Sequence, residues 1–180
     1  MKNRILEDMH VHSTFSDGVH SIEENIKQAE DIGLKRLCCV DHVRHDTGWV
    51  TEFVNTVENL KTQTNVQVFS GLEAKILNRN GDLDLPKNYG EADFIYVADH
   101  QFPLDDKYFH PKEIREMLSK GIVAAEELLE SLTDATVHAI EKHEKIVIAH
   151  LFSVLPKAGL SEDQISKKLL EKIAITAKRF

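Results

Sequence analysis

Short apolar runs alternate along the chain with longer stretches that repeat an apolar residue every three or four positions. The runs are typical of buried strands and cover residues 5–12, 36–41, 66–77, 93–98 and 145–149. The helical periodicity covers residues 21–33, 49–63, 111–143 and 161–178. Strands that alternate with helices predict an α/β fold, built on a parallel sheet or barrel with right-handed crossovers.

Helix boundary signals mark the first and last helical stretches. Ser21 and Glu24 have the spacing of a capping box, and Gly33 is placed to end the same helix. A second capping box, Ser161 with Gln164, is expected to start the final helix.

The middle of the chain carries two further local signals. Residues 78–82 contain an Asn-Gly pair and predict a hairpin turn, with the chain returning through residues 83–85. The long helical stretch is expected to consist of two helices broken near residues 132–134. Five strands and one hairpin fall short of a full (β/α)₈ barrel, which needs roughly 250 residues, so the pattern indicates an unfinished barrel.

Composition narrows the class of protein. The 180 residues are 42% hydrophobic and 29% charged, as in an ordinary globular protein, and favour one domain over residues 1–180. The net charge of −8 argues against a general nucleic-acid surface. No apolar run approaches the roughly 20 residues that cross a bilayer, and residues 1–4 start no secretory signal. The adjacent Cys38 and Cys39 are expected to be small core residues, and we expect a cytoplasmic protein without a membrane partner.

Histidines gather where the predicted strands end. His10 and His12 are two positions apart, so they project to the same side of an extended strand. Three more histidines directly follow apolar runs, and one glutamate lies within a run: His42, His100, His150 and Glu73. The carboxyl ends of parallel strands meet at one edge, where ligands bind, and imidazole is a common metal ligand.

This arrangement predicts a metal site at the sheet edge. Taken alone, His10 and His12 are also compatible with a polar strand end that carries incidental histidines. The other histidines are expected at the surface, and His45 is close enough to the predicted site to be ambiguous; the surface set is His20, His110, His138 and His143.

Taken in order, these motifs resemble the PHP (polymerase and histidinol phosphatase) superfamily, over nearly the whole chain. The matching motifs are His10-x-His12-x₄-Asp17-Gly18, Val40-Asp41-His42, Gly71-Leu72-Glu73, Asp99-His100 and Ala149-His150-Leu151. The resemblance implies a distorted (β/α) barrel of the PHP type, incomplete at the C-terminus. It also implies one to three Zn, Mn or Fe ions used for phosphoester hydrolysis.

The resemblance further implies three ligand groups. They are His10 and His12 with a bridging Glu73, Glu73 with His100 and His150, and Asp17 with His42. The family pattern ends in an Asp-Ala-His-like motif that does not occur after His150, so the first and third groups would each lack one ligand.

Catalytic roles are expected for Glu73 and His100 within this set. Arg44 and Lys75 are candidate phosphate contacts, and exposed salt bridges are an equal alternative for both. Asp41 and Asp99 precede ligands in the sequence and are candidates to orient them, or else are turn or cap residues.

The sequence therefore supports a phosphoesterase that hydrolyses a small phosphomonoester, similar to histidinol phosphate, through metal-activated hydroxide. The alternative is a non-catalytic or degenerate metal-binding module that needs further C-terminal elements or a partner chain. If the chain is a fragment, its last helix is expected to expose Leu169, Leu170 and Ile173, and this would favour a homo-oligomer.

Overall fold

The computed structural model describes residues 6–179, so the first residue of the predicted first strand, Ile5, lies outside the described residues. The chain divides into two compact units. Unit 1 is Met1–Ala74 with Leu85–Tyr96, and unit 2 is Lys75–Asp84 with Val97–Phe180. The assignment of residues 1–180 to one domain stays a prediction.

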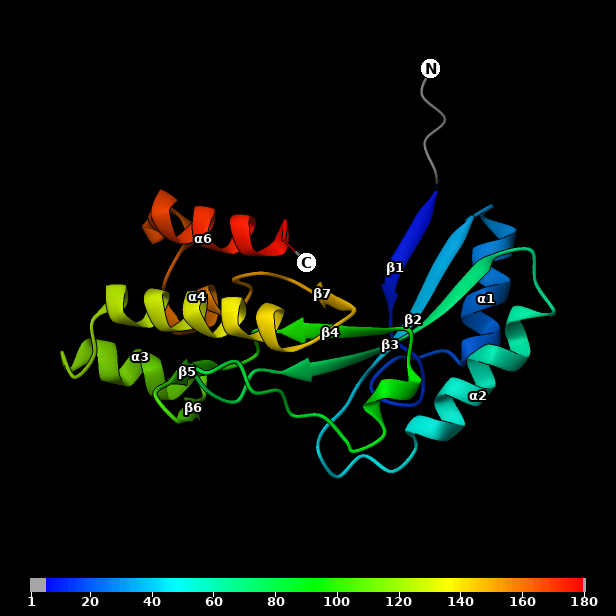
Figure 1. Ribbon diagram of the computed structural model, residues 1–180, viewed down its shortest axis with the longest axis horizontal. Helices are drawn as coiled ribbons and strands as arrows, with labels where there is room; N and C mark the ends of the chain where they lie inside the picture. The colour runs from blue at the N-terminus through cyan, green and yellow to red at the C-terminus, as the bar shows by residue number, and fades with distance from the viewer. Residues whose placement is uncertain (1–5, 180) are drawn as a thin grey trace, which may run out of the picture. The chain divides into compact units, whose positions relative to one another are not determined.

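Unit 1 is an α/β unit with parallel strands. Its strands are β1 (Glu7–Val11), β2 (Arg36–His42), β3 (Gln67–Lys75, which continues into unit 2) and the start of β4 (Phe94–Ala98). Its helices are α1 (Ile22–Asp31), α2 (Val50–Lys61) and the short 3₁₀ helix η1 (Tyr89–Glu91). β1 pairs with β2 and β2 with β3, both in parallel, and α1 and α2 lie along these strands (Figure 1).

The sequence signals of unit 1 are confirmed. The Ser21 hydroxyl accepts from the Glu24 backbone N–H and the Glu24 carboxylate accepts from the Ser21 N–H, so the capping box is complete. Gly33 follows the helix with φ +79°, a left-handed conformation that glycine adopts without strain. Cys38 and Cys39 are fully buried free thiols in the core.

Strand register places two of the candidate ligands side by side. His42 pairs with Glu73 at the carboxyl ends of β2 and β3. The pairing of β1 with β2 is irregular between Asp8 and Val11, and β1 ends at Val11. His10 therefore lies on the strand, whereas His12 is the first residue of the loop that follows.

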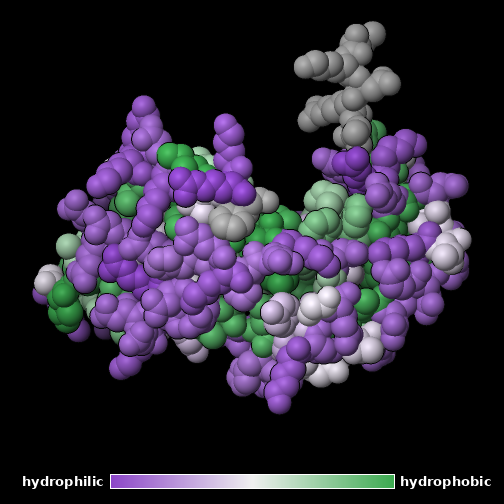
Figure 2. Space-filling model, in the orientation of Figure 1, coloured by the Kyte–Doolittle hydropathy of each residue, from purple (hydrophilic) through white to green (hydrophobic). Residues whose placement is uncertain are grey.

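Unit 2 contains the end of β4, the strand β7 (Ile146–Ile148) and a hairpin formed by β5 (Phe102–Leu104) and β6 (Lys107–Phe109). β7 is the neighbour of β4. Its helices are α3 (Pro111–Ser119), α4 (Ala125–Lys142), α5 (Leu155–Ala158), the 3₁₀ helix η2 (Glu162–Gln164) and α6 (Lys167–Ala177). Polar side chains cover most of the visible face of α4 and α6 (Figure 2).

All five expected strands are thus present, and within each unit they neighbour one another in chain order, as in part of a (β/α) barrel. Among residues 6–179, no helix combines the length and apolar character that crossing a membrane requires.

The expected helix break near residues 132–134 is wrong. α3 ends before Gly121, whose φ of +66° interrupts the helix, and α4 starts at Ala125. Leu132 and Thr133 lie in the middle of α4 and are fully buried. Burial against the core outweighs the weak helix propensity of the Thr-Asp pair in this position.

The second capping box and the hairpin are also placed differently. Ser161 and Gln164 cap η2, and Ser166 caps the final helix α6. The expected return through residues 83–85 is reduced to one antiparallel bridge between Ile76 and Leu83. The hairpin of β5 and β6 was not expected, because its three-residue strands are too short for an alternating pattern.

The expected apolar stripe on the last helix is wrong in two of its three residues. Ile173 is buried and Leu169 packs against the core of unit 2, whereas Leu170 is 44% exposed. This core is formed mainly by α3, α4, α5 and the β5 hairpin, and α6 packs chiefly against α4.

Candidate metal centre

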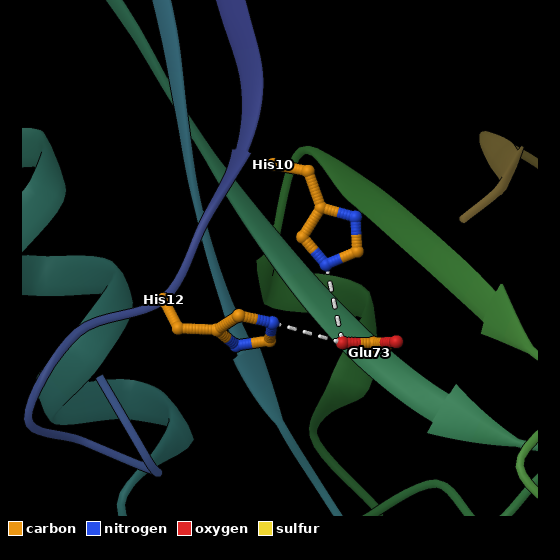
Figure 3. Close-up of side chains that lie close together, drawn as sticks. All are labelled: His10, His12 and Glu73. Carbon is orange, nitrogen blue, oxygen red and sulfur yellow. Dashed lines mark hydrogen bonds and ion pairs between the residues drawn. The ribbon is translucent and has the colours of Figure 1, made fainter. Parts of the chain in front are cut away.

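Three imidazole rings of unit 1 converge on one carboxylate oxygen. Glu73 Oε2 lies 3.2 Å from His10 Nε2, 3.3 Å from His12 Nε2 and 3.3 Å from His42 Nδ1. Figure 3 shows the rings of His10 and His12 directed from β1 and the following loop toward Glu73 on β3. The Glu73 side chain is 0% exposed, so this carboxylate is buried and lies among three imidazole nitrogens.

A second carboxylate faces two of the same rings. Asp17 Oδ1 lies 3.6 Å from His12 Nδ1, and Asp17 Oδ2 lies 3.4 Å from His42 Nε2. The two rings stack with their centroids 4.5 Å apart. Each ring therefore has one nitrogen toward buried Glu73 and the other toward Asp17, whose side chain is 68% exposed.

The donors make two groups of the size that a metal ion requires. The group of His10, His12 and Glu73 and the group of His12, Asp17 and His42 each have ligand atoms within 4.8 Å of one another. A neutral imidazole has only one acceptor nitrogen, so one ring can ligate only one ion at a time. With both positions filled, His12 is common to the two groups and can ligate only one of the two ions.

Two observations on His12 fit a bound cation. Its Nδ1 is buried and makes no hydrogen bond within the described residues, since Asp17 at 3.6 Å is beyond hydrogen-bond distance. Burial lowers the pKa of His12, and the nearby His42 and His10 lower it further against the opposing effect of Glu73 and Asp17. The ring is thereby held neutral at pH 7, and the neutral ring is the form that binds metal.

Unit 2 brings together a second set of side chains. His100 and His150 stack with ring centroids 5.1 Å apart, and Asp99 Oδ1 lies 3.3 Å from His150 Nδ1. Ser153 Oγ donates to Asp99 Oδ1 at 2.9 Å and lies 2.9 Å from His150 Nδ1. A carboxylate on one imidazole nitrogen is the usual way of orienting a metal-ligating histidine, as the sequence suggested for Asp99. Ser153 was not singled out from the sequence.

Comparison with known proteins decides the family. The sequence profile of the PHP domain matches residues 8–179. The chain belongs to the PHP family. It is 37% identical over 103 residues to a probable phosphatase of Clostridium acetobutylicum, covering 54% of this chain and 41% of that protein. It is 30% identical over 128 residues to a probable phosphatase of Caldanaerobacter subterraneus subsp. tengcongensis, covering 69% and 49%. The chain thus spans about half the length, or less, of these PHP relatives.

Asp41 of this PHP domain contacts the loop after β1. It is fully buried, and its carboxylate accepts from the backbone N–H of Ser13 and from the hydroxyls of Ser13 and Ser16. Burial raises the pKa of Asp41, although these hydrogen bonds act in the opposite direction. Its contacts hold the chain that carries two candidate ligands, His12 and Asp17.

Arg44 and Lys75, the two candidate phosphate contacts of the PHP domain, differ in exposure and in their partners. Arg44 is exposed on the loop that follows His42. Lys75 Nζ lies 3.4 Å from Asp84 Oδ2 and 4.7 Å from the centre of the Tyr108 ring, all within unit 2. Lys75 thus forms a salt bridge, as in the alternative, but a largely buried one rather than an exposed one. Contact with phosphate stays a prediction for both residues.

The remaining histidines follow the expectation in part. His20 and His110 are exposed, as expected. His138 and His143 are half-buried, which corrects their expected surface position. His138 Nδ1 lies 2.8 Å from the carbonyl oxygen of Arg79, so this ring fixes the turn at residues 78–82 against α4. Its position on the inward side of a helix explains the burial.

Proposed function

We propose that this PHP protein is a metal-dependent phosphoesterase that hydrolyses a small phosphomonoester, with compounds similar to histidinol phosphate as the substrate class. The observation that carries the proposal is the convergence of His10, His12 and His42 on one oxygen of buried Glu73. Membership of the PHP family and the probable phosphatases among its relatives, at 28–37% identity, support the same reaction class.

The donor set suits Zn, Mn or Fe, because it combines imidazole with carboxylate. His10, His12 and Glu73 would hold one ion, and His42 with Asp17 would hold another. His100 and His150 stay predicted ligands of a further ion, with Glu73 as the predicted bridge. Bound ions of this kind lower the pKa of water and neutralise phosphate oxygens.

The charges of the site explain why cations are needed. Glu73 and Asp17 are both acidic, and a phosphate monoester is itself a dianion or monoanion at pH 7. Their fields would repel the substrate, and cations held between them reverse the local sign. Arg44, exposed two residues after His42, is the residue we propose to bind the phosphate oxygens from the solvent side.

The test is metal content and turnover of the purified protein, with p-nitrophenyl phosphate as substrate and Mn²⁺ or Zn²⁺ supplied. His12→Ala removes a ligand shared by both groups, and we expect its rate to fall by roughly two orders of magnitude or more. His20→Ala is the matched control, because the exposed His20 side chain lies in the same unit, outside both ligand groups, and is paired with Glu24. Its rate should stay at the wild-type value.

Wild-type turnover no greater than that of His12→Ala would overturn the proposal. Tightly held metal without turnover would instead favour the non-catalytic metal-binding module.

We further propose that the strands form part of a distorted barrel of the PHP type and that the protein is a cytoplasmic homo-oligomer. Light scattering at micromolar concentration tests the assembly, and a sharp monomer would contradict it.

A further inference from the structure

Asp41 is a buried carboxylate at the end of β2, directly before the candidate ligand His42. Its Oδ1 accepts from the Ser13 N–H at 3.0 Å and from the Ser16 hydroxyl at 2.5 Å, and its Oδ2 accepts from the Ser13 hydroxyl at 2.6 Å. A buried carboxylate is costly unless hydrogen bonds compensate it. Here all three observed donors come from the loop that follows β1.

Ser13 is the point at which this loop is closed on itself. Its carbonyl oxygen accepts from the N–H groups of Ser16 and Gly18, at 3.1 and 2.9 Å, and its hydroxyl accepts from the Phe15 N–H at 3.2 Å. A Cβ added to Gly18 would lie 2.6 Å from the Ser13 nitrogen and would overlap backbone atoms of His12. Fixing Ser13 therefore fixes the whole segment from His12 to Gly18.

We infer that Asp41 is a positioning residue for the metal centre: it anchors Ser13 and thereby sets His12 and Asp17 at ligand distance from His42, an inference that rests on the proposed function. The hydrogen bonds between Ser13 and Asp41 connect the loop to β2, and His42 is the residue directly after Asp41 on that strand. The contacts of Asp17 with His12 and His42, at 3.6 and 3.4 Å, depend on that connection. Ligands held in place before metal arrives cost less entropy on binding.

The same unit contains a matched Ser–Asp connection outside both candidate ligand groups. The Ser70 N–H and hydroxyl both donate to Asp93 Oδ2, at 2.9 and 3.1 Å, and Ser70 is almost fully buried on β3. Ser70→Ala and Ser13→Ala therefore remove the same hydroxyl from two buried serines that are each bonded to an aspartate, Asp93 being 35% exposed and Asp41 fully buried. They differ in whether the pair holds candidate metal ligands.

Metal affinity separates the two roles. We would measure Zn²⁺ binding by competition with a chromogenic chelator, together with thermal unfolding of the metal-free protein. Both serine variants are expected to lower the Tm. Ser13→Ala should weaken Zn²⁺ binding by about 10–100-fold, whereas Ser70→Ala should stay within about twofold of wild type, since distant sites act independently.

A substitution at Asp41 itself separates anchoring from charge. Asp41→Asn keeps Oδ1 as an acceptor, and its amide nitrogen can donate to the Ser13 hydroxyl in place of Oδ2. It should retain most of the Zn²⁺ affinity, whereas Asp41→Ala should lose at least as much as Ser13→Ala.

The chain also contains a fluorescent reporter of the loop. Trp49 is the single tryptophan, and its ring lies 5.4 Å from that of Phe15 on the anchored segment. In the metal-free protein, Ser13→Ala should shift tryptophan emission to longer wavelength, and Ser70→Ala should not. This readout is independent of turnover.

Equal losses of Zn²⁺ affinity in Ser13→Ala and Ser70→Ala would overturn the inference, as would an Asp41→Asn protein that binds as weakly as Asp41→Ala. Wild-type affinity in Ser13→Ala would overturn it while leaving the proposed function intact. A wild-type protein that binds no metal would overturn both.

Discussion

Gly18 lies in the loop that follows β1 and has no room for a side chain. In Gly18→Ala, the new Cβ would overlap the backbone carbon and oxygen of His12 and lie 2.6 Å from Ser13 N. Ordinary contact begins at 3.4 Å, so Ser13 N must move by about 0.8 Å. That movement stretches its 3.0 Å hydrogen bond to Asp41 beyond bonding distance.

The cost has two parts. Overpacking of a close-packed site costs about 1–3 kcal/mol, and a lost hydrogen bond to a buried carboxylate adds about 1–3 kcal/mol. The sum of about 2–6 kcal/mol corresponds to a Tm lower by roughly 4–24 °C for a chain of this length. Zn²⁺ affinity should fall as well, because Ser13 carries the anchor of His12 and Asp17.

Thermal unfolding followed by circular dichroism, with a chelator present, measures the stability effect without any contribution from metal. Gly90→Ala is the control: Gly90 lies in the same unit, has no atom within 4 Å of an added Cβ and has no left-handed backbone. A Gly18→Ala protein that melts together with Gly90→Ala would refute the reasoning, since it would mean that the loop adapts without cost.

Two further predictions concern unit 2. Asp134 is hydrogen-bonded by Arg79 and Lys172; burial raises its pKa, but these bonds outweigh burial and hold the pKa below its usual value. A depressed carboxyl pKa gives stability that is fully present above the unfolded pKa of about 3.9 and is lost as the pH falls through the lower folded pKa, so Asp134→Asn should cost about 1–3 kcal/mol at pH 7 and progressively less as the pH falls below about 3.9 in urea titrations. Leu132→Ala should cost about 2–5 kcal/mol because Leu132 is fully buried in the core of unit 2, whereas Ile122→Ala, at 65% exposure, should cost little; equal losses would contradict the packing described.

Several parts of the fold could be predicted from the sequence because local signals and burial agree there. The apolar run of β2 favours a strand locally and is also buried in the core. The Ser21–Glu24 capping box starts α1, a helix whose apolar residues are likewise buried. The break near residues 132–134 failed because the weak local propensity of Thr133 and Asp134 competes with tertiary contacts. Leu132 and Thr133 are buried, and Asp134 is tied to Arg79, so packing keeps α4 continuous.

The candidate site was predictable to the extent that each ligand follows a recognisable strand. Strand direction alone places His42 and Glu73 at the same edge. The sequence predicts only one side of the contact between Asp41 and the loop. Asp41 is a candidate because it precedes His42, but the sequence contains no sign that Ser13 and Ser16 donate hydrogen bonds to it. Their contacts depend on how a seven-residue loop closes, and neither periodicity nor spacing encodes that closure.

The number of donors in unit 1 bears on the kind of metal site this is. His10, His12 and His42 supply three acceptor nitrogens when neutral, and Glu73 and Asp17 supply the carboxylates. Imidazole and carboxylate together are the donors of catalytic zinc sites. A structural zinc site is closed by four protein ligands, often cysteines, and both cysteines of this chain are buried in the core. The donor set of unit 1 combines imidazole with carboxylate and contains no cysteine, so its chemistry supports the proposed hydrolase over a structural zinc site.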